Sequence, residues 1–414
     1  MNHVATWSIA FLSIAGVIIR PFKVPEAAWV LGGVVLLLAC GLISPAESLT
    51  GVGRGSDVYL FLTGMMLLAE IAREEKVFDW LAAHATNMSK GSGSRLFLLI
   101  YLTGTLVTMF LSNDATAVVL TPAVIAATRA AKVKNPLPYL LICAFIANAA
   151  SFVLPISNPA NLVIYGSNMP PLLQWLQLYL LPSVVAIIMT YIMLYINQKR
   201  SIRQEIETSI KIPVLAIGGR TALWGIAATA IILLLTSWLD VPLGMPTAVT
   251  GILTTAFVLL IAKKSPRQIL KGVTWSILLL VAGLFVIVEA LNKTGLVDVL
   301  ASILQHELSK SITATVWACG FIVAFGCNLV NNLPAGLFAG HVVQTGEVPG
   351  MIKSAILIGT DLGPNLSVTG SLATILWLVA LRREGINITA WDFLKIGFLV
   401  MTAALLFSIG SLWL

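Results

Sequence analysis

Long apolar runs fill this sequence almost from end to end. Hydrophobic residues make up 58% of the 414 positions and charged residues only 10%, and the mean hydropathy is +0.95. Soluble domains carry about 25% charged residues, so this composition excludes a soluble globular fold. A helix crosses a bilayer with about 20 apolar residues, and many segments approach or exceed that length. We therefore predict an all-α polytopic membrane protein.

The hydrophobic pattern predicts ten membrane crossings and two re-entrant hairpins, which enter the membrane and return on the same side. The first apolar stretch lacks a basic leader and a small-residue cleavage site, so it is taken as a true crossing rather than a signal peptide. The expected crossings are 4–19, 26–43, 57–75, 138–165, 173–197, 221–239, 243–262, 271–293, 351–381 and 391–412. The expected hairpins are about 94–131 and about 310–346.

Four short polar interruptions stand inside these apolar segments. Two lie in the hairpins, at Ser112–Thr116 and Asn328–Pro334, and two lie in the crossings that follow, at Pro155–Asn161 and Thr360–Asn365. Irregular backbone at membrane depth is tolerated only where it is buried in protein or lines a watery cavity. Paired breaks in corresponding places of two halves point to a substrate site near the midplane. We therefore expect a transporter.

The two halves of the chain repeat each other weakly at one fixed spacing. The matching pairs, each 219 positions apart, are Gly64 with Gly283, Glu70 with Glu289, Asp79 with Asp298, and Asn113 with Asn332. Five crossings per half is an odd number, so the second half would enter from the opposite side as an inverted repeat. The expected units are residues 1–197, a linker at 198–220, and residues 221–414.

The basic residues predict the orientation. With these ten crossings and two hairpins, 21 of the 25 lysines and arginines fall on one side of the membrane and four on the other. Arg20 and Lys23 belong to the larger group. Basic residues are retained in the cytoplasm, so both termini are expected outside it and the linker inside. The linker is either a helix on the membrane surface or a solvated segment. The basic excess is a topology signal, and no nucleic-acid partner is expected.

Polar residues at the interruptions form the candidate substrate site. Hairpin tips expose backbone N–H groups, and asparagine side chains add both donors and acceptors. The alternative is that these residues only cap broken helices. The candidates are Ser112, Asn113, Thr116, Ser157, Asn158, Asn161, Asn331, Asn332 and Asn365.

Two acids, Asp114 and Asp361, are expected in the interruptions and are the candidates for proton coupling. An ionisable side chain inside a membrane segment is costly and indicates function by default, and a carboxyl group removed from water binds a proton more readily. The alternative is a permanently charged helix cap. Glu70 and Glu289 lie near Arg73 and Lys293 and are expected to form structural ion pairs.

No enzymatic or cofactor site is expected. The sequence contains no Walker motif, HExxH or GxSxG, and its four cysteines form no CxxC pair. His306 is expected in an outer loop. These features predict a secondary transporter without ATPase activity, resident metal or cofactor.

Three segments carry a family resemblance. Ser112–Pro122 resembles the Ser-Asn-Thr hairpin signature of the ion transporter superfamily, and Ala147–Asn161 resembles its following broken helix. Asp361–Trp377 resembles the arsenite/antimonite efflux permease branch, the ArsB type. Asp114 stands where the dicarboxylate branch has Thr, which argues against a sodium/dicarboxylate carrier.

The resemblance implies an elevator-like fold, in which a mobile domain of hairpins and broken helices moves against a scaffold. It implies export of trivalent arsenite or antimonite, as neutral As(OH)3 or Sb(OH)3, in exchange for protons across a bacterial plasma membrane. Beyond the lipid bilayer, two partners stay open: a cytoplasmic arsenic-stimulated ATPase and a second copy in a homodimer. A sodium/proton antiporter of the same superfamily is the main alternative. A second alternative is a membrane subunit that recruits a soluble partner without transporting. Contact between the cargo and the thiol of Cys319 or Cys327 also stays open.

Overall fold

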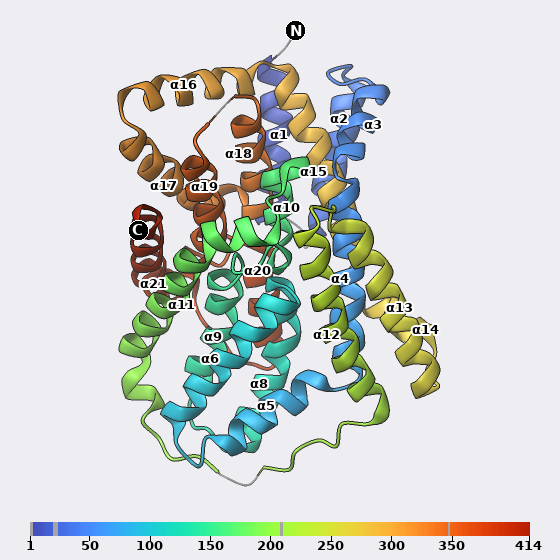
Figure 1. Ribbon diagram of the computed structural model, residues 1–414, viewed down its shortest axis with the longest axis vertical. Coiled ribbons are helices and arrows are strands. Elements are labelled where there is room, and N and C mark those ends of the chain that lie inside the picture. The colour runs from blue at the N-terminus through green and yellow to red at the C-terminus, as the bar shows by residue number, and fades with distance from the viewer. Residues whose placement is uncertain (1–2, 20–23, 208–209, 347) are drawn as a thin grey trace.

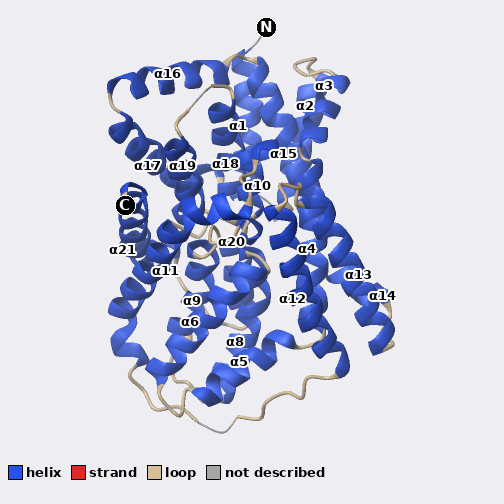
Figure 2. Ribbon diagram, in the orientation of Figure 1, coloured by secondary structure: helices blue, strands red, loops and turns tan. Residues whose placement is uncertain are grey.

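The computed structural model describes residues 3–19, 24–207, 210–346 and 348–414. Arg20 and Lys23, which were counted with the basic side, lie outside the described residues. Helices joined by loops make up the whole described chain, and most of them run along its long axis (Figures 1 and 2). Seven of the described helices are long and apolar enough to cross a membrane, or eight if the bent pair α3–α4 is one crossing. The protein is therefore an all-α, multi-span membrane protein.

Eleven α-helices precede the linker in the part of the chain that the structure describes. They are α1 (His3–Ile19), α2 (Glu26–Ala39), α3 (Pro45–Arg54), α4 (Ser56–Glu74), α5 (Val77–Met88), α6 (Gly93–Phe110), α7 (Asn113–Ala115), α8 (Thr121–Ala130), α9 (Leu137–Ala149), α10 (Pro159–Tyr165) and α11 (Leu172–Ile202). A π-helical turn, Thr116–Leu120, joins α7 to α8, and short 3-10 turns cover Pro155–Ser157 and Gly166–Asn168.

Ten α-helices follow the linker in a matching order within the described residues. They are α12 (Ile217–Trp238), α13 (Gly244–Ala262), α14 (Pro266–Gly272), α15 (Ser276–Lys293), α16 (Leu296–Lys310), α17 (Ile312–Val330), α18 (Asn332–Gln344), α19 (Gly350–Leu362), α20 (Leu372–Arg383) and α21 (Ala390–Gly410). Short 3-10 turns cover Gly363–Leu366 and Ser411–Trp413. The helices that follow the two hairpin tips begin at Asn113 and Asn332, the spacing found in the sequence.

The structure confirms that the helices are interrupted near the predicted places and corrects two positions: the second interruption begins after Ala149, before the expected Pro155, and the fourth begins later than expected. Helix α6 stops at Phe110, α9 stops at Ala149, and α17 stops at Val330. The fourth break begins at Gly363, later than expected, so Asp361 lies in the last turn of α19 rather than in the break. Pro364 follows directly, and proline ends or kinks a helix because it lacks an N–H donor.

Four of the described helices, α3, α5, α14 and α16, were not predicted, and the linker is neither a surface helix nor free in solvent along its whole length. Helices α5 and α16 lie at opposite ends of the molecule and run across the direction of most others (Figure 1). His306, expected in a loop, lies in α16. The first linker residues, 198–202, continue α11. The segment that follows pairs with the α5–α6 turn, where Ser92 and Glu205 form an isolated antiparallel bridge.

The helices pack as two groups. The α4–α13 bundle contains α1–α4 and α12–α15, and the hairpin bundle contains α6–α11 and α17–α21. Within the first group α4 packs closely on α13 and α2 on α15, and within the second α17 packs on α19 and α11 on α21. The two halves also interleave in the hairpin bundle, because α10 packs on α18 and α20 on the π turn of the first hairpin.

Glycine allows the closest helix contact in the α4–α13 bundle. The backbones of Gly64 in α4 and Gly251 in α13 face each other, with no room for a side chain between them. Small residues permit such approach, which helix association in a membrane depends on. At the start of α13, the Gly244 N–H donates to the Asp57 carboxylate of α4 at 2.7 Å.

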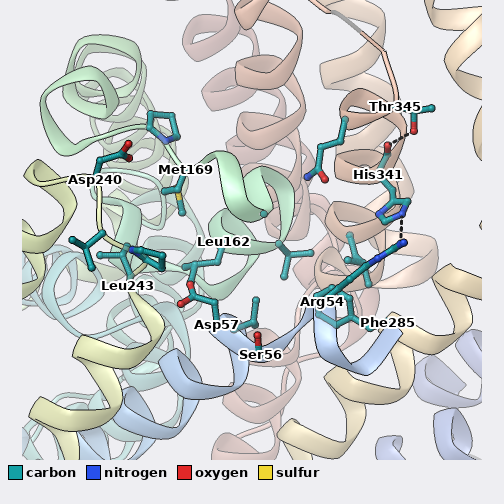
Figure 3. A pocket seen from close by; sticks show the side chains of 18 of the residues that line it. Arg54, Ser56, Asp57, Leu162, Met169, Asp240, Leu243, Phe285, His341 and Thr345 are labelled. Atoms are coloured by element: carbon teal, nitrogen blue, oxygen red, sulfur yellow. Dashed lines mark hydrogen bonds between the residues drawn. The ribbon is translucent and has the colours of Figure 1, made fainter. Parts of the chain in front are cut away.

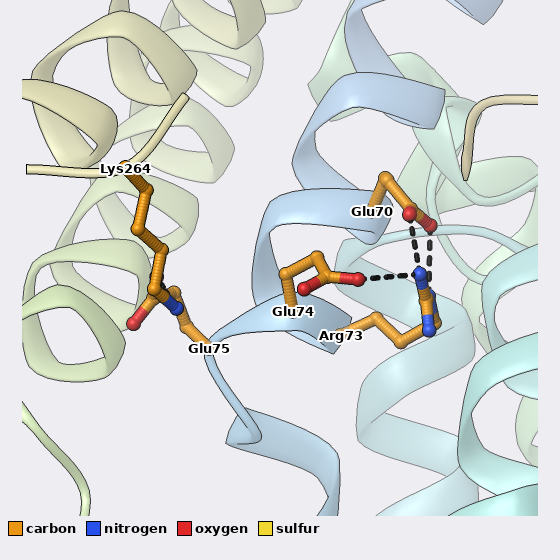
Figure 4. Close-up of polar contacts among 5 residues, drawn as sticks. All are labelled: Glu70, Arg73, Glu74, Glu75 and Lys264. Atoms are coloured by element: carbon orange, nitrogen blue, oxygen red, sulfur yellow. Dashed lines mark hydrogen bonds and ion pairs between the residues drawn. The ribbon is translucent and has the colours of Figure 1, made fainter. Parts of the chain in front are cut away.

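Ion pairs fasten the ends of this bundle. Lys264, after α13, lies 2.7 Å from the buried carboxylate of Glu75, after α4 (Figure 4). Arg73 donates to both Glu70 and Glu74, which confirms the structural pairing expected of Glu70 (Figure 4). Glu289 is paired as well, but with Arg54 rather than with Lys293, which binds Glu47 instead.

Candidate functional site

A small cavity lies where the two bundles meet, and both hairpin tips reach it. Its volume is about 30 Å³, room for roughly two water molecules. Helices α4 and α15 supply apolar walls, including Leu62 and Leu284. The polar lining comes from Glu26, Asn113, Asp114, Asn158, Asn331 and Asn332. Five of these six, all but Glu26, were candidates from the sequence, and the structure brings these five together from three separate interruptions.

The first tip forms because α6 ends in extended backbone at Ser112, whose hydroxyl accepts from the Ala115 N–H at 3.2 Å. The Asn113 side chain accepts from the Asp114 N–H at 2.9 Å, so its amide N–H groups stay available. The carboxylate of Asp114 has no hydrogen-bond or ion-pair partner among the described residues. Thr116 contacts Thr108 at 2.8 Å and ties the two arms together behind the tip.

The second tip is a single residue. Asn331 separates α17 from α18 with a φ of +72° and a ψ of 153°, a backbone region that residues other than glycine rarely adopt. Its side-chain oxygen accepts from the Leu333 N–H at 3.4 Å. The Asn332 N–H donates to the Gly370 carbonyl in the fourth break at 2.9 Å. The second hairpin and the second broken helix are therefore held together at the cavity.

Asn158 links the cavity to a buried acid. Its oxygen accepts from the Ala160 N–H at 3.0 Å and so caps α10. Its Nδ2 donates to Asp361 Oδ1 at 2.7 Å. Asp361 is fully buried, and its Oδ2 has no hydrogen-bond partner among the described residues. Asp361 thus lies behind the cavity wall, one hydrogen bond away from it.

Other candidates brace the interruptions from behind. Asn365 accepts from Asn148 Nδ2 at 3.0 Å and donates to the Phe145 carbonyl at 3.1 Å. Asn161 donates to the Ser151 carbonyl, and Ser157 donates to Met109. The residues that the structure places outside the cavity lining are Ser112, Thr116, Ser157, Asn161, Asn365 and Asp361. The contact observed for Ser112 is a helix cap, as the alternative interpretation of these polar residues predicts.

Helix ends and carboxylates set the electrostatics of the cavity. The helical segments that begin at Asn113, Pro159, Asn332 and Leu372 all start at its wall. Helix N-termini carry partial positive charge, which Asp114 and Glu26 oppose. No lysine, arginine or histidine lines the cavity among the residues that the structure describes. Such a site suits a neutral polar solute or a cation better than a multiply charged anion.

A larger vestibule of about 790 Å³ opens next to this cavity (Figure 3). Leu162 in α10 and Leu337 in α18 line it, about one turn beyond Pro159 and Pro334, which line the cavity. Arg54 of α3 crosses between the bundles, binding Glu289 of α15 and lying 3.1 Å from His341 Nε2 of α18. This cluster joins the α4–α13 bundle to the second hairpin.

Glu26 and the vestibule cluster of Arg54, Glu289 and His341 were not predicted as part of the site from the sequence. Glu26 was assigned to the first turn of a crossing, and its position after Pro25 in an apolar segment was the available signal. Arg54 and His341 are 287 positions apart, and their meeting has no signature in a single sequence.

Comparison with known proteins identifies relatives across most of the chain. A family model described as citrate transporter (CitMHS) matches residues 14–358. The protein named arsenical pump membrane protein in Escherichia coli is 28% identical over 386 residues, covering 91% of this chain and 90% of the relative.

Two solved structures share the fold. The YdaH transporter of Alcanivorax borkumensis gives a TM-score of 0.59 at 13% identity, covering 88% of this chain and 86% of the other. MtrF of Neisseria gonorrhoeae, described within a class of antimetabolite efflux pumps, gives 0.56 at 12% identity, covering 92% and 84%.

Proposed function

The chain belongs to the citrate transporter (CitMHS) family of secondary transporters, and we propose that it exports trivalent arsenite or antimonite in exchange for protons. The observation that carries the proposal is the cavity where both hairpin tips meet, lined by asparagine amides and by carboxylates. The relative named arsenical pump membrane protein supports this cargo over citrate.

The chemistry of the cavity fits a neutral trihydroxide. As(OH)3 and Sb(OH)3 donate and accept hydrogen bonds, as do the amides of Asn113, Asn158 and Asn332. Citrate carries several negative charges near pH 7 and would face Asp114 and Glu26 without a basic side chain among the described lining residues. The present volume is too small for a solute of four heavy atoms, so the walls must separate to admit one.

Proton exchange is assigned to Asp114 and Asp361. Asp114 faces the cavity without a partner, so a proton and the cargo can compete for the same place. Asp361 is linked to the cavity through Asn158, whose Nδ2 donates to Asp361 Oδ1 at 2.7 Å. Ionised Asp361 holds the Asn158 amide in place in the cavity wall. When Asp361 binds a proton it becomes a weaker acceptor for that amide, so proton binding disfavours the arrangement that binds cargo.

Alternating access is proposed to use two inverted repeats, residues 1–197 and 221–414, with ten crossings and a linker at 198–220. The matching helix order and the interleaved hairpins support this architecture. The hairpin bundle would move as an elevator against the α4–α13 bundle, with both termini outside the cytoplasm of a bacterial cell. The arsenic-stimulated ATPase and the homodimer remain additional partner proposals.

Sodium/proton antiport is the second candidate. The observation that favours it is the presence of two carboxylates, Asp114 and Glu26, beside amide oxygens in one cavity, because hard cations bind oxygen ligands of this kind. One experiment separates the two: uptake of arsenite into everted membrane vesicles, energised in turn by a proton gradient and by a sodium gradient. Arsenite accumulation on the proton gradient supports the first candidate. Sodium movement coupled to protons, without arsenite accumulation, supports the second.

A further inference from the structure

A second concave site lies between α5, the linker and the start of α12, elements in the lower part of the molecule in Figure 1. The groove measures about 660 Å³. Trp80 of α5 forms one wall and residues 212–215 of the linker form another. Leu223 and Trp224 of α12 complete it, and Trp224 is 77% exposed.

One cation lines this otherwise apolar groove. Arg220, in the first turn of α12, is exposed and forms no ion pair among the described residues. Lys211 stands just before the groove in the linker, exposed and likewise without an ion pair among the described residues. The negative charge that would complement them is therefore not supplied by the described part of the chain.

The surroundings identify the kind of molecule that would supply it. Helix α12 is apolar enough to cross a membrane, so its exposed face meets acyl chains. Tryptophan is enriched at the level of lipid headgroups. Basic residues at the cytoplasmic surface attract anionic lipids, each contributing about 1 kcal/mol.

We propose that this groove binds one anionic phospholipid. Its phosphate accepts hydrogen bonds from the Arg220 guanidinium, a planar group suited to phosphate oxygens. One acyl chain lies along Leu223 and Trp224. Because the linker forms a wall, the lipid holds the linker against both α5 and α12, which belong to opposite halves of the chain. This site does not depend on the identity of the transported solute.

Native mass spectrometry of the full-length protein in detergent tests the proposal. Phosphatidylglycerol and phosphatidylcholine with the same acyl chains are titrated separately, and the apparent Kd of the first bound lipid is measured. The wild type should bind phosphatidylglycerol about fivefold more tightly than phosphatidylcholine, the equivalent of about 1 kcal/mol. R220Q should abolish this preference, and R220K should retain most of it. W224A should weaken binding of both lipids.

The matched control is R267Q, which removes another exposed arginine without an ion pair among the described residues, at the first turn of α14. It should keep the preference for phosphatidylglycerol. Equal binding of phosphatidylglycerol by wild type and R220Q would overturn the proposal, as would an equal loss in R267Q. A change in the ratio of monomer to oligomer in R220Q, with lipid binding unchanged, would assign the groove to a second copy of the chain instead.

Discussion

Each polar residue at the site either braces a broken helix or lines the cavity, and Asn158 does both. Its oxygen caps α10 while its nitrogen holds Asp361 at 2.7 Å. The sequence allowed the polar residues to be predicted because asparagine and aspartate are unusual inside apolar segments. It could not separate residues that line the cavity from those that brace it, because the direction of a side chain depends on where each helix stops. Asp361 illustrates this, since the break begins at Gly363, three residues later than expected.

Removing an amide from the cavity should weaken cargo binding. We expect Asn113→Ala and Asn332→Ala each to raise the KM for arsenite about fivefold, the loss of about 1 kcal/mol for one hydrogen bond. Arsenite uptake into everted vesicles measures this, with expression checked by immunoblot. Thr103→Ala is the control, because Thr103 bonds its own helix away from the cavity. An unchanged KM would remove the substituted asparagine from the site.

Replacing Asp114 by Asn tests the proton role. The variant keeps the size of the side chain but has no carboxylate to gain or lose a proton. We expect Asp114→Asn to lose uphill accumulation of arsenite while retaining downhill exchange of radiolabelled arsenite across proteoliposomes. If Asp114 only supports the helix end, Asn should replace it well, because Asn and Asp cap helices about equally. Full accumulation by the variant would leave Asp361 as the carrier.

At the level of helices, the interruptions were predictable and the cross-running helices were not. Asn and Pro inside an apolar run mark a break whatever surrounds it. Helices α5 and α16 mix polar and apolar residues and are too short to cross a membrane, so a search for apolar segments passes over them. Their positions depend on how the helices on either side pack, which the sequence pattern does not show.

The contact of α4 with α13 should be intolerant of added volume. Gly251→Ala would place a methyl group against the backbone of Gly64, which has no side chain that can move aside. We expect a loss of about 1–3 kcal/mol in stability, seen as a lower unfolding temperature in detergent. Gly32→Ala, in α2 and facing open space, should be neutral or slightly stabilising because alanine favours helix over glycine. Equal effects of the two changes would contradict the packing described.

The whole molecule is nearly symmetric in sequence order but not in its contacts. The Arg54–His341 contact joins the two bundles beside the vestibule. The positions 219 residues away hold Val273 and Pro122, which cannot form such a contact. In the proposed alternating access, one state would therefore have this polar contact, a latch, that the other lacks, and the latch should favour the state described here.

Breaking this latch should change the balance of states. Arg54→Gln removes the contact with both Glu289 and His341, and a contribution of up to about 1 kcal/mol corresponds to a shift of up to about fivefold. Spin labels at Asp240 and Thr345, on opposite sides of the vestibule (Figure 3), should report a second distance population in a cysteine-free background. Lys310→Gln, which breaks an ion pair within α16, should leave the distances unchanged. A distance distribution identical in Arg54→Gln and wild type would show that the latch does not set the state.

The central claim is that one cavity between the bundles couples arsenite export to proton entry. The most direct measurement is arsenite accumulation by purified protein in proteoliposomes, where a pH gradient is imposed and then collapsed with an ionophore. We expect arsenite to accumulate against its gradient while the pH gradient lasts and to lose this accumulation when the pH gradient collapses. A sodium gradient should not replace the pH gradient. Accumulation that survives collapse of the pH gradient, or that follows sodium instead, would contradict it.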